Sequence, residues 1–233
     1  MEKFKLESFV IAAGIFLAGF CVFKGLESLA ERGRIVSVRG LAEKEVKANH
    51  VIWPIVYKTT GNDLGQLYNE IKVKNKCIQD FLVKNGIPAE HLSIAAPEIR
   101  DRKADQYNYD YKGDRYNVKA VITVATEQVD KVIELIPRMG ELLKDGIAIT
   151  TGEYDNQVTF EYTSLNEIKP EMIEEATRNA RQAAEKFAKD SDSKLGKIQS
   201  ATQGLFSIDD RDSYTHHIKN VRVVTSVNFS LED

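Results

Sequence analysis

Carboxylate and imidazole side chains crowd one short segment near the C-terminal end of the chain. The segment holds Asp209, Asp210, Asp212, His216 and His217. These are ligand types that a divalent metal takes in proteins, and a carboxylate beside an imidazole can also transfer protons. Their spacing matches no established motif, so we favour the simpler interpretation of a solvated hairpin loop. We therefore predict no metal site and keep these residues as candidates for metal-dependent or enzymatic chemistry.

A second group of side chains is aromatic. Tyr107, Tyr109 and Tyr111 alternate along one predicted strand, and Tyr116 follows the turn 112–115. Alternate residues of a strand share a face, so these rings would line one face of a hairpin. That face would serve as a subunit contact or a small-ligand or peptide platform, because tyrosine combines a large contact area with a polar tip. An aromatic ladder packed within its own domain is the interpretation that we favour, and a subunit contact is the main alternative.

Common catalytic and cofactor motifs are missing from the sequence. The chain has no phosphate-binding glycine loop, HExxH, GxSxG, CxxC pair or dinucleotide fingerprint. Cys21 lies in an apolar N-terminal run and Cys77 in a predicted helix, so we expect no disulfide. We interpret Cys77 as a small core residue rather than a redox-sensing thiol. We therefore predict that the protein is not an enzyme and that it has no catalytic residues and no cofactor.

Composition points to a folded chain without a nucleic-acid partner. Hydrophobic residues make up 42% of the 233 residues, which is enough for a sizeable core. Charged residues make up 29% but nearly cancel, leaving a formal net charge of -3. Because no broad basic face is implied, we expect no binding to nucleic acid.

The elements that position these side chains are predicted from hydrophobic periodicity and turn residues. Helices are predicted after Asp63, from Val129 to Leu143 and from Pro170 onward, the last with Pro170 in its first turn. Strands are predicted at 35–39, 46–59, 92–111, 116–125, 147–151, 157–163, 196–208 and 219–231. Paired strands between helices favour an α+β fold, with mostly antiparallel sheets in ββα repeats and three main helices.

Three local signals refine this prediction of the elements. The first two helices end alike, in Asn85-Gly86-Ile87 and Asp145-Gly146-Ile147, which predicts a repeated helix-to-strand unit. Pro54 lies inside the second strand and cannot donate to a ladder, which predicts an edge strand or a bulge there. In the third helix, alanines at a spacing of four predict a close approach to a sheet.

The N-terminal residues are typical of a membrane-targeting segment. Residues 9–23 contain no charged side chain, and Lys3, Lys5 and Lys24 flank them. A helix of that length spans about 22 Å, short of the ~30 Å hydrocarbon core, which suits a marginal anchor or a signal-peptide core. We favour an uncleaved anchor, with cleavage after Ala30 as the alternative. Phe20 before Cys21 argues against a lipoprotein signal.

By the third helix the sequence resembles a known family. The stretch 175–188 is an alanine-spaced helix, and Leu195-Gly196-Lys197-Ile198 follows it. Both are similar to the signature of SIMPL-domain proteins, also called domain of unknown function 541. The opening 36–40, the helix stop 85–87 and the tyrosine strand also fit, so the resemblance covers about residues 35 to 231.

The chain departs from the family pattern at two places. Asn49-His50 stands where the family commonly has Pro-Asp, and Asp192 replaces the glycine that ends the third helix. Asp tolerates the left-handed backbone conformation better than most residues, so we expect that turn to survive.

The resemblance implies an exported or membrane-attached bacterial envelope protein, in some members assembled into oligomers or linked to oxidative-stress defence. We expect residues 1–33 to form the signal or anchor and linker, and 34–233 a SIMPL-like domain in the periplasm at the inner membrane, or a free periplasmic domain if the signal is cleaved. The expected partners are the membrane, through residues 9–23, and further copies of the chain. The leading hypothesis is a non-enzymatic protein that works by assembly or binding, with any protein or small-ligand partner unidentified.

Overall fold

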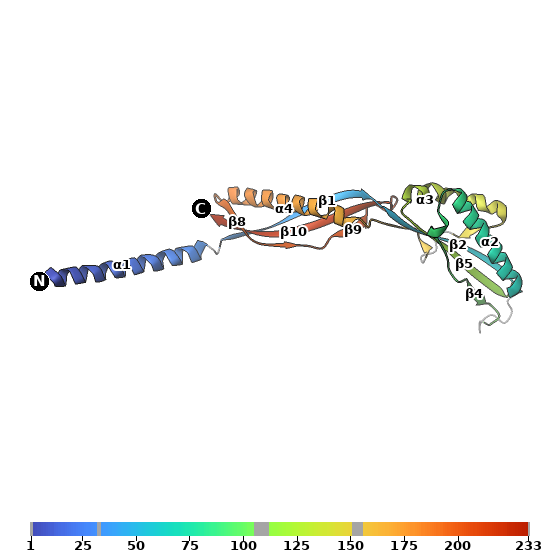
Figure 1. Ribbon diagram of the computed structural model, residues 1–233, viewed down its shortest axis with the longest axis horizontal. Coiled ribbons are helices and arrows are strands. Elements are labelled where there is room, and N and C mark those ends of the chain that lie inside the picture. The colour runs from blue at the N-terminus through green and yellow to red at the C-terminus, as the bar shows by residue number, and fades with distance from the viewer. Residues whose placement is uncertain (1, 32–33, 105–111, 151–155, 233) are drawn as a thin grey trace. The chain divides into compact units, whose positions relative to one another are not determined.

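A computed structural model describes residues 2–31, 34–104, 112–150 and 156–232. The chain forms two compact units. Unit 1 comprises residues 1–44, 166–207 and 221–233, and unit 2 comprises 45–165 and 208–220. The described residues form four α-helices and antiparallel sheets, so the predicted α+β class is confirmed. Figure 1 shows the elements in chain order.

Apart from the N-terminal helix, unit 1 consists of one helix on one sheet. Strands β1, β10 and β8 lie in that order, and helix α4 lies along them, as Figure 1 shows. A backbone hydrogen bond from Leu231 N to Arg34 O, 2.9 Å, joins β10 to the start of β1. These elements are α4 (Leu165–Asp190), β1 (Ile35–Lys47), β8 (Lys194–Gln203) and β10 (Ile218–Glu232). Strand β9 (Ser207–Asp210) belongs to unit 2 except for its first residue.

Small side chains set the spacing between α4 and its sheet. Met172 and four alanines spaced four apart are at most 2% exposed: Ala176, Ala180, Ala184 and Ala188. Opposite them, a Cβ atom added at Gly40 would lie less than 3.0 Å from the carbonyl oxygen of Ala176 and the backbone nitrogen of Ala180. The predicted close approach is confirmed, because the helix backbone itself meets the strand.

Helix α4 begins earlier than predicted and ends where predicted. It starts at Leu165, so Pro170 lies inside the helix and not in its first turn. After α4, Asp192 takes a φ of 53°, in the left-handed region. Ser193 N donates to Ala188 O at 2.9 Å, and Asp192 N donates to Lys189 O at 3.2 Å. Asp192 therefore serves as the left-handed helix stop that the sequence predicted.

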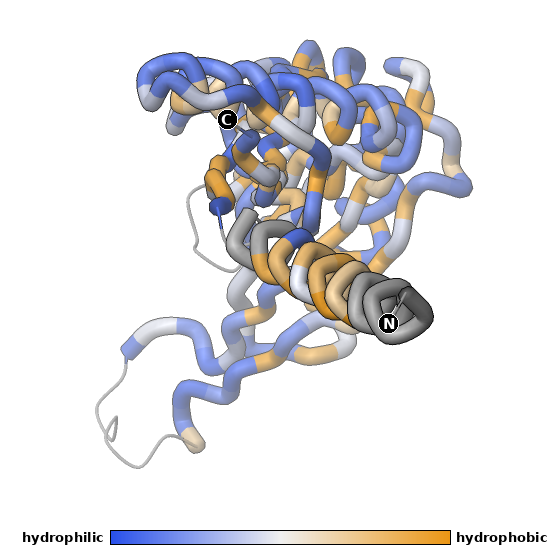
Figure 2. Tube along the Cα trace, turned by 90° about the vertical axis from the view of Figure 1, so that its left-hand side faces the viewer, coloured by the Kyte–Doolittle hydropathy of each residue, from blue (hydrophilic) through white to orange (hydrophobic). Residues whose placement is uncertain are grey.

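The N-terminal residues form helix α1 (Glu2–Glu31). Eight large apolar side chains between Ile11 and Leu26 are each at least 55% exposed. Figure 2 shows the described part of this helix as largely apolar. Among the residues that the structure describes, no helix combines the length and the apolar character needed to cross a membrane.

Unit 2 packs helices against one face of a larger sheet. The sheet order is β3-β5-β2-β6, with β4 also on β5 and β7 also on β2. Alternate residues of β2 and β5 share one core with α2, α3 and the 3₁₀ helix η2. Bounds are β2 (His50–Gly61), α2 (Leu64–Lys84), η1 (Ala89–His91), β3 (Leu92–Ile94), β4 (Glu98–Asp101), β5 (Tyr116–Thr126), α3 (Val129–Leu135), η2 (Ile136–Asp145), β6 (Ile149–Thr150) and β7 (Thr159–Glu161).

The two predicted helix stops of unit 2 have the same geometry. Gly86 and Gly146 both have positive φ, 93° and 71°. The residue after each glycine donates back into its helix, Ile87 N to Leu82 O at 3.0 Å and Ile147 N to Leu142 O at 3.1 Å. Both isoleucines are at most 1% exposed. The repeated motif therefore turns each helix end and buries the isoleucine in the core.

The structure corrects the predictions for two strands of unit 2. Strand β2 lies inside the sheet and pairs with β5 without a register shift from Val51 to Gly61, so it is neither an edge strand nor bulged. Its other side pairs with β7 at 50–52 and with β6 at 56–57. Pro54 falls between these two short ladders, where no donor is needed. Within the described part of the strand expected at 92–111, which is 92–104, there are two short strands, β3 and β4, with Pro97 between them.

Candidate functional site

The predicted metal-ligand loop belongs to unit 2, where its charged side chains pair with one another. The Asp210 carboxylate accepts from Lys219 Nζ and lies 2.6 Å from His216 Nδ1. Burial raises the pKa of Asp210, but hydrogen bonds from Lys219 and His216 outweigh it and hold that pKa below its usual value. Lys219 is only 9% exposed. The pair therefore gives a buried ammonium group its counter-charge.

Asp212 shapes the turn of the same loop. Its carboxylate accepts from the Thr215 hydroxyl, from Tyr214 N at 2.8 Å and from Arg211 Nε at 3.1 Å. The Thr215 hydroxyl, then the Tyr214 amide, holds the pKa of Asp212 far below its usual range. A carboxylate that accepts this many hydrogen bonds stays ionised and fixes the backbone around it.

The remaining residues of the loop face other elements. His217 meets the Phe160 ring edge-on, with 6.1 Å between centroids, and its carbonyl accepts from Ala48 N at 2.8 Å. Asp209 is exposed in β9. The described part of the chain contains no group of three or more His, Cys, Asp or Glu side chains placed to hold a metal ion. The structure thus brings together Asp210 and His216, while Asp212 and His217 serve separate contacts.

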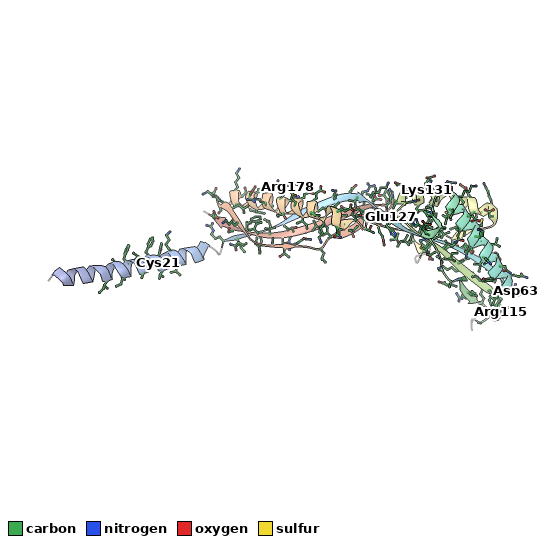
Figure 3. All side chains as sticks on the ribbon, in the orientation of Figure 1. Cys21, Asp63, Arg115, Glu127, Lys131 and Arg178 are labelled. Atoms are coloured by element: carbon green, nitrogen blue, oxygen red, sulfur yellow. The ribbon has the colours of Figure 1, made fainter. Side chains whose placement is uncertain are left out.

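The predicted tyrosine face lies mostly outside the described residues. Tyr107, Tyr109 and Tyr111 lie outside the described residues. Tyr116 opens β5, half-buried, with the Arg115 guanidinium 4.9 Å from its ring centroid. Arg115, labelled in Figure 3, donates to Asp101 through Nη2 at 2.7 Å and Nε at 3.0 Å. This paired contact ties the start of β5 to the end of β4.

Unit 2 contains a groove that sequence reasoning missed. It lies between α2 and η2, with a volume of about 730 Å³, within the range of small-molecule sites. Cys77 lines it, and its Sγ lies 3.5 Å from Asp145 Oδ2. Burial, and then the Asp145 carboxylate, raises the pKa of this thiol. Cys77 and Asp145 are distant in sequence, so no local motif could have linked them. Other lining residues are Lys72, Val73, Lys76, Asp80, Phe81, Lys84, Glu141, Leu142 and Lys144.

A second, mainly apolar groove lies between α2 and the strand edge formed by β3. Its volume is about 360 Å³, and Tyr68, Ile94 and Pro97 line it. Tyr68 is 66% exposed and Ile94 48%. Apolar side chains left in water beside a sheet edge are typical of surfaces that bind another polypeptide.

A polar network under α2 has a structural role. The buried Tyr57 hydroxyl donates to Asn75 Oδ1 at 2.8 Å. Burial, and then the charge of Glu70, raises the pKa of Tyr57 to about 12. Glu70 in turn accepts from Thr59 at 2.7 Å and pairs with Lys74 at 2.6 Å. Every group in the network has a partner, so it fixes α2 on β2 and leaves no reactive group exposed.

Comparison with protein families gives one match. The family model described as "SIMPL: Protein of unknown function (DUF541)" matches residues 36–224. This span is well over half of the chain and agrees with the resemblance drawn from the alanine helix and its flanking strands. No curated protein sequence matches the chain.

Proposed function

The chain belongs to the SIMPL family of proteins of unknown function, and from this premise we propose that it attaches to a membrane through α1 and acts there by self-assembly or binding, not by catalysis. We place it in the bacterial envelope, at the inner membrane, with the rest of the chain in the periplasm. If the signal is cleaved, the same domain is a free periplasmic protein.

The exposed apolar surface of α1 is the observation that carries this proposal. Its eight large apolar side chains between Ile11 and Leu26 make the helix costly to leave in water. Removing them from water would be worth on the order of 10 kcal/mol in total. In the sequence, Lys3, Lys5 and Lys24 flank the apolar run and would meet lipid headgroups. A lipid surface satisfies both the apolar run and its charged flanks.

Fractionation of cells that express the full chain tests the attachment. The full chain should pellet with membranes and resist alkaline carbonate, whereas a chain that starts at residue 34 should stay soluble. Phe16→Asp with Leu17→Asp should weaken the attachment, and Leu205→Asp, a matched change at a side chain 96% exposed in unit 1, should not. Recovery of the intact wild-type chain from the soluble cytosol would contradict the proposal.

Mass spectrometry separates the anchored form from the cleaved form. An uncleaved anchor leaves the full 26.3 kDa chain in the membrane fraction. Cleavage after Ala30 leaves a shorter chain in the periplasm, with a new N-terminus at Glu31. A role in oxidative-stress defence is a further implication of the family. We propose to test it by the survival of a deletion strain in peroxide, with the wild-type gene restored as the control.

Small-ligand binding in the α2–η2 groove is a second candidate function. The volume of the groove and its mixed lining of apolar and charged residues favour it. Because Cys77 lines the groove, a bound ligand should slow alkylation of this thiol by N-ethylmaleimide. The assay uses the Cys21→Ser chain, in which Cys77 is the one remaining cysteine. A ligand that stabilises the protein but leaves the alkylation rate of Cys77 unchanged must bind elsewhere.

A further inference from the structure

Strand β4 has one side without a neighbour in the described part of the sheet. It pairs with β5 from Glu98 opposite Lys119 to Asp101 opposite Tyr116. Glu98, Ile99 and Arg100 are all exposed, Ile99 to 55%. A sheet edge of this kind presents unpaired backbone groups that another strand can use.

The hydrogen-bond phase of β4 determines which backbone groups point outward. Arg102 N donates to Arg115 O at 2.8 Å, in the same register as the ladder. Antiparallel pairing alternates, so Glu98 and Arg100 direct their backbone groups toward β5, and Ile99 directs its N–H and C=O to the open side. Ile99 is therefore the residue through which β4 would pair with a further strand.

The two positions that flank Ile99 on the open side complement each other. Pro97 has no N–H and offers only a carbonyl. The carbonyl of Asp101 already accepts from Ala104 N at 3.2 Å, so Asp101 offers only its N–H. In an antiparallel pairing centred on Ile99, Pro97 of one strand faces Asp101 of the other. The Pro97 carbonyl of one strand then accepts from the Asp101 N–H of the other. No further backbone donor or acceptor at these two positions is left without a partner.

The side chains of β4 are self-complementary in the same register. With Ile99 opposite its own copy, Glu98 of each strand faces Arg100 of the other. Opposite charges directly across an antiparallel pair stabilise it. Ile99 itself points to the helix-covered face, in register with the buried Val118. The sequence Glu98-Ile99-Arg100 thus matches itself in charge, apolar contact and backbone bonding when it is reversed.

We propose that β4 pairs antiparallel with β4 of a second copy, about a two-fold axis at Ile99. The two unit 2 sheets then become one continuous sheet. This inference rests on the proposed function, because it names the surface by which the chain assembles. A ladder of five residues per strand, 97–101, is short for a stable dimer in solution. Attachment of both copies to one membrane raises their effective concentration, which lets a short ladder suffice.

A charge swap in the full chain tests the pairing by the fraction of dimer that a chemical cross-linker traps in the intact membrane, before any extraction. Glu98→Arg places arginines opposite each other, and Arg100→Glu does the same with glutamates. Each single variant should weaken dimerisation at least tenfold, and the double variant should restore it to within twofold. The proposal would be overturned if the single variants dimerised as strongly as wild type. It would also be overturned if the double variant dimerised as weakly as the single variants.

Cross-linking locates the axis. In a chain with Cys21→Ser and Cys77→Ser, Ile99→Cys should form a disulfide-linked dimer under mild oxidation, because Cα atoms of a hydrogen-bonded pair lie about 5.5 Å apart. The control is Val73→Cys, at a side chain of α2 that is 69% exposed. Equal cross-linking at both positions would overturn the proposed axis.

The outcomes separate this inference from the proposed function. If the wild-type assembly is unchanged in the Glu98 and Arg100 variants, self-assembly stands and another surface carries it. If the wild-type chain is attached to membranes but monomeric, both the pairing and the assembly part of the proposal fail while the attachment stands.

Discussion

The two units place a helix on a sheet in opposite ways. In unit 1, α4 meets its sheet through alanines spaced four apart, and the backbone of the helix lies against Gly40. In unit 2, α2 meets its sheet through Leu67, Ile71, Ile78 and Leu82. The packing of unit 1 therefore depends on small side chains between helix and sheet. The packing of unit 2 depends on large apolar side chains that fill the space between helix and sheet. The contrast predicts that the two units respond differently to the same kind of mutation.

The comparison also shows what the family signature reports. The alanine helix, the segment 195–198 and the strand 36–40 all belong to unit 1. A Cβ atom at Gly196 would lie within 3.1 Å of the Ser230 carbonyl oxygen, so this glycine too permits a close contact. The signature therefore records how unit 1 packs. The grooves and the edge of β4 that is open among the described residues lie in unit 2.

The largest expected effect is at Gly40. Gly40→Ala should lower the free energy of unfolding by more than about 3 kcal/mol, because the new methyl group meets helix backbone that cannot move aside. Gly61→Ala is the matched change in unit 2, where the added atom would meet only the Leu67 side chain, at 3.1 Å. It should cost less than about 1 kcal/mol. Urea unfolding followed by far-ultraviolet circular dichroism measures both, and equal costs would remove the distinction between the units.

In unit 2 the damaging change is loss of volume. Ile78 is fully buried, so Ile78→Ala should destabilise by about 3 kcal/mol through lost burial and a residual cavity. The single tryptophan, Trp53, belongs to the same core, so its fluorescence reports the change. Val83→Ala, at a position of α2 that is 45% exposed, is the control and should cost less than about 1 kcal/mol. Similar costs at the two positions would mean that α2 is not held by its buried face.

A smaller effect of opposite sign is expected at the end of α4. Asp192 holds a positive φ that costs less for glycine. Asp192→Gly should therefore stabilise unit 1 by up to about 1 kcal/mol, and Asp192→Val should destabilise it. Thermal unfolding of the two variants beside wild type measures the difference. A Gly variant less stable than wild type would show that the aspartate side chain contributes more than the backbone strain costs.

The smallest effect is the response of the unit 2 loop to acid. The pKa of Asp212 is lowered in the folded chain, so its contribution to stability is present above the unfolded value of about 3.9 and is lost as pH falls below it. Asp212→Asn keeps an acceptor for Tyr214 N but cannot titrate. Its stability should fall less steeply than that of wild type below about pH 4, and Thr215→Val should change the slope in the same direction. Parallel curves for all three proteins would show that the carboxylate is not linked to folding.

Local signals predicted the elements of this fold well. Gly86, Gly146 and Asp192 mark helix ends because a left-handed residue stops a helix whatever surrounds it. The alanine spacing predicted a close helix-sheet contact because a stripe of small side chains on one helix face is visible in the sequence itself. The predictions made from Pro54 and Pro170 were wrong. Pro54 sits in an interior strand because two short strands leave a gap beside it, which depends on residues distant in sequence.

The candidate sites could be predicted only in part. The Asp210–His216 contact joins residues close in sequence, and their crowding was visible. Lys219, which neutralises Asp210, could not be predicted as its partner because a lone lysine in a strand belongs to no motif. The groove around Cys77 forms where α2 meets η2, and the open edge of β4 depends on the sheet order. Tertiary arrangement alone creates both.

The mass of the native assembly, cross-linked in the membrane before extraction, tests the central claim most directly. The account predicts that the full chain is found in the membrane fraction and runs as a dimer or a larger even multiple of 26.3 kDa. Glu98→Arg should reduce that mass, and adding Arg100→Glu should restore it. A wild-type chain that stays a 26.3 kDa monomer in the soluble fraction would contradict both the attachment and the assembly.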